Sequence, residues 1–309
     1  MRIVIHLLVL LLDGAFLTAA QAAGLDLSAN GITFPDGSLQ TTAAGGQGKC
    51  TEITQSDIPL TISAKGVYCL TEDVSSGPTA ITIRADNVVL NLNGYLIDGS
   101  SAGSNTIQEG IFCQDRKNVV ITNGAIKGYF WGVLLNNCDG AQVTHLRVMQ
   151  NYGSGIDMFN GSDNVLIAHN HIYHIGGTTR SGFMYMYGIS VRSDCPGARI
   201  LENDIYDVFS PTGGRSYGIR AWSTAGEVSN NRISGLITQG GGLEIPISFI
   251  GKNGLLRNNT ISGSGTNAIT YAISVGGIGS SALCADNKVI GFTTATSGCN
   301  DGGGNVAVP

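Results

Sequence analysis

Asn203-Asp204-Ile205 is one copy of a phrase that returns along this chain: an Asn, one variable residue, and then Ile or Val. The Asn residues of five such copies are 33, 28, 28 and 28 residues apart. A fixed period of about 20 to 50 residues is typical of a solenoid, in which similar units stack on one another. The five copies begin at Asn170, Asn203, Asn231, Asn259 and Asn287.

Each repeat is rich in β-branched residues, Asn and Gly, and its side chains alternate with a period of two, which favours strands over helices. A second strand opens with Gly in several repeats, as in Gly155-Ile156-Asp157, and a third precedes the Asn phrase, as in Asn164-Val165-Leu166-Ile167. Three strands in each unit of 22 to 33 residues predict a parallel β-helix. About eight or nine coils, spaced about 4.8 Å apart, would make a rod roughly 40 Å long.

The repeated Asn has a structural role in such a coil. An inward Asn at a tight turn tolerates left-handed backbone geometry, and its amide can bond to the next Asn in the stack. The Ile or Val two residues later is expected to fill the dry interior. We therefore predict a ladder of hydrogen-bonded Asn side chains along the solenoid.

With Val88-Val89-Leu90-Asn91-Leu92-Asn93-Gly94 as its opening coil, the repeat resembles the right-handed parallel β-helix proteins of the pectate-lyase-like superfamily. The resemblance covers about residues 80–292. It implies an all-β fold, a right-handed parallel β-helix with capped ends. It does not imply one activity, because the fold hosts lyases, hydrolases, epimerases, phage tailspikes and adhesins.

The chain before the repeat divides into three segments. Residues 1–22 have the charged start, the apolar run and the small-residue cleavage site of a signal peptide, so we expect a secreted protein, extracellular or periplasmic, without a membrane span. Residues 23–49 contain Pro35-Asp36-Gly37 between two β-prone runs and look like a motif of phage tail-fibre and cell-surface proteins. They would form an attachment or trimerisation stub, or a linker with one hairpin. Residues 50–80 are expected to cap the helix, and 81–309 to form it, with a tail closed by a disulfide.

The seven cysteines suit an oxidising compartment. Cys50–Cys69 and Cys284–Cys299 are the preferred disulfides, and the other three cysteines, Cys113, Cys138 and Cys195, leave one over. The sequence has no close-spaced Cys pair of the kind that binds zinc, so no metal site is predicted, and no cofactor is indicated.

Charge separates two classes of partner. The net charge of −5 argues against nucleic acid. The stretch from Arg180 to Arg232, however, contains six Arg and five acidic residues, so its net charge is +1. This stretch is therefore the expected place for a polyanion.

Two long coils, at residues 173–187 and 209–217, are expected to project as loops on one binding face. Alternation places aromatic, Arg and acidic side chains outside on the strands beside them, a combination that suits a sugar chain. An ordinary solvated face is the alternative. The catalytic candidates are Asp157, His169, His171 and Arg220, and the substrate-binding candidates are Tyr173, Arg192, Asp204, Tyr206, Trp222 and Arg232.

Three reactions can be compared on these residues. A glycosidase needs two carboxylates, for which Asp157 with Asp194 or Asp204 would serve, but the polygalacturonase signatures are missing. A segment around Asp157 is similar in placement to the Asp-Pro-His-Asp/Glu segment of mannuronan C5-epimerases. Phe159 stands where those enzymes have the catalytic His, so this reaction is not adopted. A lyase needs a base and a cation that stabilises the enolate, and His, Tyr and Arg are present.

These observations predict a secreted β-helix protein that recognises a polysaccharide, with its site on the face between residues 157 and 232. If it is an enzyme, a lyase acting on acidic polysaccharide is favoured. The alternative is a non-catalytic cell-surface, adhesion or phage-tail-like module.

Overall fold

The computed structural model describes residues 26–28, 31–33, 39–40, 50–192, 195–211, 213–263 and 271–309, which belong to two units, Met1–Cys50 and Thr51–Pro309. In the first unit, β1 (Asp26–Ser28), β2 (Gly31–Thr33) and β3 (Leu39–Gln40) form an antiparallel sheet. The predicted signal peptide and the Pro35-Asp36-Gly37 turn lie outside the described residues. The strands β2 and β3 flank that turn in the sequence.

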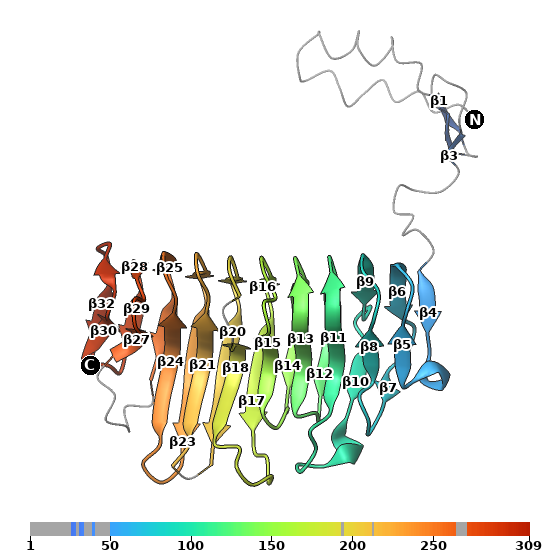
Figure 1. The fold of residues 1–309 in the computed structure, drawn as a ribbon. Coiled ribbons are helices and arrows are strands. Elements are labelled where there is room, and N and C mark those ends of the chain that lie inside the picture. Colours follow the sequence, from blue (N-terminus) through green and yellow to red (C-terminus); the bar gives the residue numbers. More distant parts are fainter. Residues whose placement is uncertain are drawn as a thin grey trace, which may run out of the picture. The chain divides into compact units, whose positions relative to one another are not determined.

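The second unit is a stack of coils whose strands pair in parallel with the strands of neighbouring coils (Figure 1). One row, here called sheet A, has ten strands. They are β5 (Leu60–Ile62), β8 (Ile81–Ile83), β11 (Glu109–Lys117), β13 (Trp131–Asp139), β15 (Ser154–Phe159), β18 (Tyr185–Val191), β21 (Arg215–Trp222), β24 (Leu243–Ile250), β27 (Tyr271–Val275) and β30 (Thr294–Ser297).

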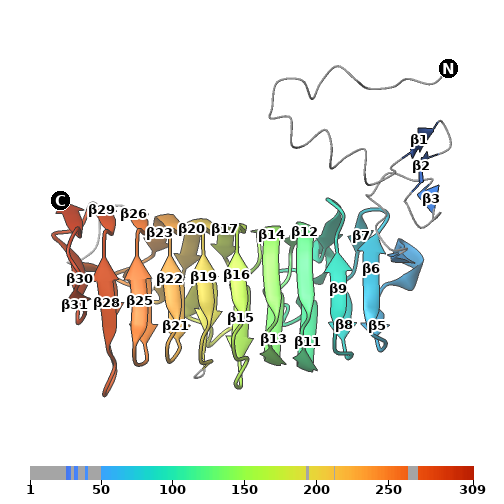
Figure 2. The same cartoon turned by 90° about the horizontal axis from the view of Figure 1, so that it is seen from above.

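The other sheet of this unit has 19 strands and bends at the Asn phrase, so that most of it forms two rows (Figure 2). Row B contains β16 (Leu166–Ala168), β19 (Arg199–Leu201), β22 (Glu227–Ser229), β25 (Gly254–Arg257) and β28 (Ala282–Ala285). Row C contains β17 (His171–Gly176), β20 (Asp204–Ser210), β23 (Arg232–Thr238), β26 (Thr260–Ser262) and β29 (Lys288–Ile290). The longer β12 (Val120–Lys127) and β14 (Gln142–Met149) run through both rows.

The remaining strands of this sheet lie at the two ends of the stack. They are β4 (Thr51–Ile53), β6 (Gly66–Leu70), β7 (Val74–Ser75), β9 (Val88–Asn91), β10 (Leu96–Asp98), β31 (Asn300–Asp301) and β32 (Val306–Val308). Two short 3₁₀ turns, η1 (Gln55–Asp57) and η2 (Ser100–Ala102), complete the elements. Three strands in a coil, all in parallel register, confirm the predicted fold: the chain is a right-handed parallel β-helix.

One apolar residue of each Asn phrase fills the interior. Ile172, Ile205, Ile233 and Ile261 are paired in register from coil to coil, and each is at most 1% exposed. The prediction that the residue two positions after the Asn packs in the core is therefore confirmed. Each such side chain contributes about 1.5–3 kcal/mol of burial.

The Asn ladder is present, and it is buried from Asn170 to Asn287. The Asn231 Oδ1 accepts hydrogen bonds from the Asn203 backbone N–H and from the Asn203 Nδ2, both at 3.0 Å. The Asn231 Nδ2 donates in turn to the Asn259 Oδ1 at 3.1 Å and to the Ile200 carbonyl at 2.8 Å. The ladder runs from Asn170 to Asn305, one coil further than the sequence pattern indicated.

The residue with left-handed backbone geometry lies one position before the ladder Asn, whereas the prediction assigned this geometry to the Asn itself. The positive φ belongs to the residue before each ladder Asn, for example Glu202 (φ 55°) and Asn230 (φ 57°). This preceding residue turns the chain from row B to row C, and the ladder Asn then follows with its amide aligned to the stack.

The strands of sheet A approach one another closely because several contain a glycine at the equivalent position. A Cβ atom at Gly188 would lie 2.5 Å from the Ile205 Cγ2 and 2.7 Å from the Gly218 carbonyl oxygen. Equivalent clashes would occur at Gly132, Gly155 and Gly218. The repeated Gly is therefore required by packing between coils.

The segment expected to cap the helix is itself wound into it. The strands β4, β5, β6 and β7 pair in parallel with β6, β8, β9 and β10. This explains why sheet A has ten strands when about eight or nine coils were expected. Of the two long coils, residues 177–184 do connect β17 to β18, whereas most of 209–217 is strand, so the second predicted loop is wrong.

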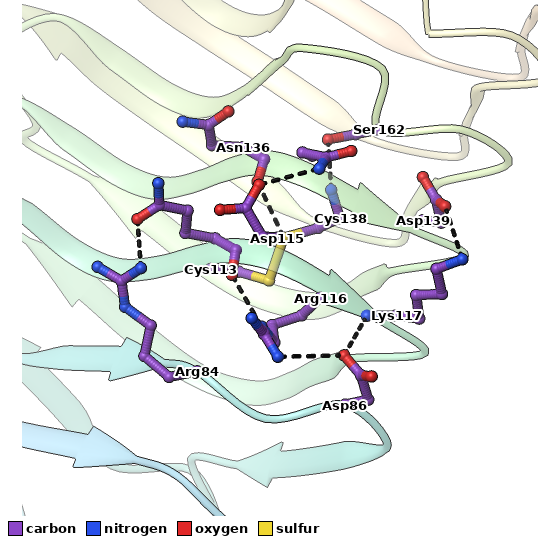
Figure 3. The surroundings of a disulfide bond; sticks show 12 residues. Arg84, Asp86, Cys113, Asp115, Arg116, Lys117, Asn136, Cys138, Asp139 and Ser162 are labelled. Atoms are coloured by element: carbon purple, nitrogen blue, oxygen red, sulfur yellow. Dashed lines mark hydrogen bonds and ion pairs between the residues drawn. A yellow bond between two sulfur atoms is a disulfide. The ribbon is translucent and has the colours of Figure 1, made fainter.

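Disulfides close neighbouring coils. Cys284 and Cys299 are bonded, as predicted, and Cys113 and Cys138 join β11 to β13 (Figure 3). Cys50 and Cys69 are also disulfide-bonded, and Cys195 is a buried thiol.

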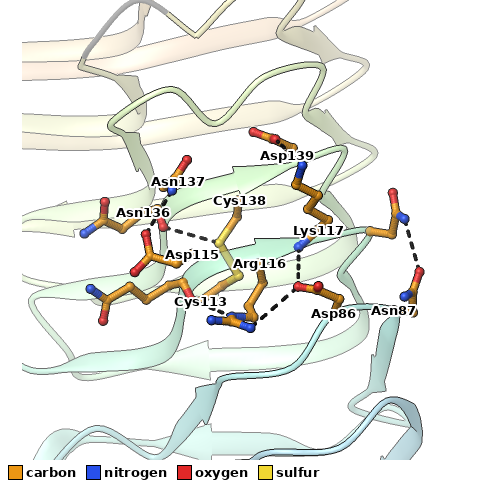
Figure 4. Close-up of polar contacts among 12 residues, drawn as sticks. Asp86, Asn87, Cys113, Asp115, Arg116, Lys117, Asn136, Asn137, Cys138 and Asp139 are labelled. Atoms are coloured by element: carbon orange, nitrogen blue, oxygen red, sulfur yellow. Dashed lines mark hydrogen bonds and ion pairs between the residues drawn. A yellow bond between two sulfur atoms is a disulfide. The ribbon is translucent and has the colours of Figure 1, made fainter.

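The corner beside the Cys113–Cys138 disulfide carries polar contacts between coils (Figure 4). Arg116 lies 3.8 Å from Asp86, and Asn137 donates to Asp115 at 2.9 Å. Such exposed contacts contribute little each, so the disulfide and the core are the main ties between these coils.

Within the described part of the chain, no helix has the length and apolar character needed to cross a membrane.

Candidate functional site

The ten candidate residues fall into two groups on two different sides of the coil. Asp157 (β15), Arg220 and Trp222 (β21) and Arg192, which follows β18, belong to sheet A. The other six belong to row C or, for His169, to the turn before it. The prediction of one shared face is wrong, because the chain turns a corner between row C and sheet A in every coil.

Asp157 is directed away from the core, as alternation predicted, but it is not accessible. Its exposed fraction is 0%. The carboxylate accepts hydrogen bonds from Trp131 Nε1 and Ser154 Oγ, each at 3.1 Å, and from Arg192 Nε at 3.1 Å and Nη2 at 2.6 Å. Burial raises the pKa of the Asp157 carboxyl, while Arg192 and the hydrogen bonds act against that rise. Both oxygens are occupied, so the expectation of an exposed catalytic carboxylate is wrong.

Arg192 is positioned by this buried carboxylate. Its guanidinium also lies 5.3 Å from the ring centroids of both Phe159 and Tyr187. The side chain therefore reaches back toward the preceding coil. The ion pair with Asp157 fixes the direction of this side chain.

Next to Arg192, aromatic and basic side chains alternate across two coils. Tyr187 and Tyr217 stack with ring centroids 5.1 Å apart, and Arg215 donates to the Tyr217 hydroxyl at 3.3 Å and lies over Tyr185. Burial raises the pKa of the Tyr187 phenol, and the nearby Arg220 guanidinium opposes this effect. The hydrogen bond to Tyr217 raises the pKa of Arg215.

Trp222 lies outside, as predicted, because Ile219 and Ala221 on the same strand are buried. Its side chain is 40% exposed and borders a groove of ≈ 600 Å³. The groove is also lined by Thr224, Ile250, Gly251, Lys252, Gly277, Ile278, Gly279 and Ser280. An aromatic ring and a lysine at one groove suit a ligand that has both an apolar face and negative charge.

Two of the arginines on sheet A have no acidic partner in the described residues. Neither Arg215 nor Arg220 forms an ion pair with a described carboxylate, whereas Arg192 is paired with Asp157. Together with the exposed Tyr185 and Trp222, these two arginines form what we call the arginine surface: Tyr185, Arg215, Arg220 and Trp222.

The group on row C has a different character. Three histidines each face a carboxylate one coil further on: His169 with Glu202 (3.3 Å), His171 with Asp204 (3.2 Å) and His174 with Asp207 (3.1 Å). Between them, Tyr173 and Tyr206 stack at 5.0 Å with nearly parallel rings. Arg232 is exposed, and its Cα is paired in register with that of Asp204.

Sequence reasoning missed several of these residues. Tyr187 and Tyr217 each stand immediately before the repeated Gly of a sheet A strand, as do Trp131 and Ser154 in earlier coils. Reading the position before each Gly as one column would have revealed the stacked rings. His174 and Asp207 are a second case, since both have the left-handed conformation and occupy equivalent places.

The described residues contain no group of three or more His, Cys, Asp or Glu side chains placed to hold a metal ion. Asp194, one of the acids weighed for a glycosidase, lies outside the described residues.

The fold and the arginine surface define a β-helix protein with an outer face rich in Arg and aromatic side chains. No protein-family model and no curated protein matches this chain. Among solved structures, an alginate lyase from Paenibacillus sp. str. FPU-7 is similar with a TM-score of 0.58 and 17% identity, covering 81% of this chain and 99% of that chain. At this identity the similarity shows the shared fold alone.

Two further structures are similar with lower scores. Endopolygalacturonase I from Stereum purpureum has a TM-score of 0.42 and 17% identity, covering 80% of this chain and 70% of that chain. The Dettilon tailspike protein has a TM-score of 0.42 and 14% identity, covering 80% of this chain and 60% of that chain.

Proposed function

We propose that this protein is exported and binds an acidic polysaccharide on the outer face of sheet A. The observation that carries the proposal is the arginine surface, where Arg215 and Arg220 lack a described acidic partner and lie between two exposed aromatic side chains. A guanidinium binds a carboxylate through two parallel hydrogen bonds, and an aromatic ring stacks on the apolar face of a sugar.

The dimensions of the surface suit a chain of sugars. Arg215, Arg220 and Trp222 lie on the same strand, β21, and the seven steps from the first to the last span roughly 23 Å. This length exceeds one sugar unit, so successive acidic units would meet Arg215, Arg220 and the Trp222 groove. Lys252 in that groove adds a further positive charge.

Two other observations support the proposal. Six cysteines are disulfide-bonded, which suits an oxidising compartment outside the cytosol. A protein named for its action on alginate has the same fold.

Turnover by β-elimination is the second candidate. Such a reaction needs a proton acceptor and a cation beside the sugar carboxylate. Tyr187 brings a phenol next to Arg220 and Arg192, which are the required group types. A non-catalytic adhesion or tail module would use the same surface without turnover.

Electrophoresis in gels containing alginate, polygalacturonate or dextran tests the binding. We expect retardation in the two acidic gels and none in dextran. Ultraviolet absorbance of the same acidic polymers incubated with the protein then separates the candidates, since elimination creates unsaturated ends. Equal mobility in all gels would refute the proposal, and retardation without absorbance would favour the module.

We further propose that residues 23–49 attach the protein to a larger assembly, with a trimer as the first arrangement to test. Light scattering should give the mass of a trimer for the full chain and the mass of a monomer for a chain that begins at residue 50.

A further inference from the structure

We propose that the corner between row C and sheet A holds a second carbohydrate site, which takes a single neutral sugar unit. The site is a pocket of ≈ 380 Å³ lined by Ser100, Gln150, Tyr152, His174, Gly176 and Phe209. Small-molecule pockets have volumes of about 300–1,000 Å³. This pocket lies at the low end of that range, which suits one sugar unit better than a long chain.

The connections around the pocket are tied together. The Ser104 carbonyl accepts hydrogen bonds from the Thr178 hydroxyl and the Thr179 N–H, both at 3.1 Å, and the Ser104 and Thr179 hydroxyls are also 3.1 Å apart. The connection at 99–108 is therefore hydrogen-bonded to the connection at 177–184. The connections of the two intervening coils, at 128–130 and 150–153, lie between them in the stack. Residues of three of these four connections or their adjoining strand ends line the pocket.

The aromatic wall depends on two glycines. A Cβ atom at Gly176 would lie 2.0 Å from the Phe209 carbonyl oxygen, and one at Gly177 would lie 2.8 Å from Phe209 Cζ. Only glycine allows the Phe209 ring to lie this close to the preceding coil. Phe209 and Tyr152 thus supply aromatic surface on which an apolar sugar face can stack.

The main polar group of the pocket is held in a fixed orientation. The His174 Nδ1 lies 3.1 Å from an Asp207 carboxylate oxygen, and Tyr173 and Tyr206 contact the imidazole edge-on at 5.2 and 5.9 Å. With Nδ1 engaged, Nε2 is the nitrogen that can bond to a sugar hydroxyl. Ser100 and Gln150 add further donors and acceptors.

The charge of the lining selects the type of sugar. None of the six lining residues is Arg, Lys, Asp or Glu, and Asp207 behind His174 is already paired. A uronate carboxylate would find no fixed cation here, in contrast to the arginine surface. The pocket therefore suits neutral hydroxyls, and its ligand differs from the acidic polymer proposed for sheet A.

Saturation-transfer NMR with the methyl glycosides of glucose, galactose and mannose, and with glucuronate, tests this site. We expect a signal from at least one neutral glycoside and, in the Arg215→Ala/Arg220→Ala double variant that lacks the arginine surface, a weaker one from glucuronate. His174→Phe and Tyr152→Ala should each weaken binding about tenfold, which corresponds to about 1.4 kcal/mol. If either of these variants folds poorly, Ser100→Trp takes its place. Ser100 is exposed at the rim, so a Trp there fills the pocket and should weaken binding to the same extent.

His171→Phe is the matched control. His171 lies on the same strand, is paired with Asp204 at 3.2 Å and contacts Tyr206, but it does not line the pocket. It should bind as the wild type does, and so should Arg220→Ala, which separates this site from the arginine surface. Absence of signal from every neutral glycoside, or equal binding by the pocket variants and the wild type, would overturn the proposal.

Discussion

Removing Arg192 should strongly destabilise the fold. The Asp157 carboxylate is fully buried and accepts four hydrogen bonds, two of which come from Arg192. Arg192→Ala leaves this charge with neutral donors alone, Trp131 and Ser154 among them. Breaking a buried ion pair by removing one partner costs about 3–5 kcal/mol. Because the Arg192 side chain is itself 31% exposed, we expect the low end, about 3 kcal/mol.

A second substitution should recover part of the loss. Asp157→Asn in the Arg192→Ala background replaces the carboxylate by an amide, whose oxygen can still accept from Trp131 and Ser154 at the position of the present Oδ2. The amide NH₂ then points toward the space that the guanidinium has vacated. The double variant should regain about 1–2 kcal/mol relative to Arg192→Ala, a coupling in the range found for residues in contact.

The loss should also depend on pH with a defined sign. Burial raises the pKa of Asp157 above its ordinary value of 3.8, so the folded state takes up a proton more readily than the unfolded state. This group therefore favours the folded state more at low pH, and its contribution declines as pH rises above 3.8. Without Arg192 the pKa rises further, so the destabilisation should shrink as pH falls from neutrality.

Urea unfolding followed by circular dichroism, at neutral and mildly acidic pH, measures all three quantities. A cost within about 0.5 kcal/mol for Arg192→Ala, which is typical of a surface residue, would refute the reasoning. So would strict additivity of the two substitutions.

Three further predictions concern the ladder, the disulfides and the arginine surface. Asn231→Leu should lower the free energy of unfolding in urea by about 3 kcal/mol, because two donors on Asn203 and the buried Ile200 carbonyl lose their partners at about 1 kcal/mol or more each. Thr260→Leu, at an exposed position, is the control, and equal stability of the two variants would exclude the ladder. Non-reducing peptide mapping should find three disulfides, among them Cys113–Cys138, and a fully reduced protein would contradict the proposed export. Trp222→Ala should leave the melting temperature unchanged but weaken retention by acidic polysaccharide about tenfold; unaltered retention would remove Trp222 from the site.

The fold could be predicted because its determinants are periodic. The ladder Asn and the Ile or Val two positions after it recur at intervals of 28 to 33 residues from Asn170 to Asn287, so the repeat is visible in the sequence. The position of the left-handed residue could not be inferred in the same way, because the residue type at this position changes from coil to coil, for example from Glu202 to Asn230. Only the backbone shows that the turn precedes the ladder residue.

The site could be predicted only in part, because alternation gives a direction and not an environment. It correctly placed Trp222 outside and Ile219 inside. It could not show that Trp131 and Arg192 cover Asp157, since these contacts depend on register between coils of unequal length. Nor could it show that His171 and Arg220 belong to different sides of the coil.

The central claim is that acidic sugars bind at the arginine surface, and the most direct test is calorimetric titration with a uronate oligosaccharide. The wild type should bind, and binding should weaken as salt is added, since exposed ion pairs are screened. The double variant Arg215→Ala/Arg220→Ala, with an unchanged melting temperature, should bind at least about tenfold more weakly. Equal affinity of the wild type and this variant would contradict the claim.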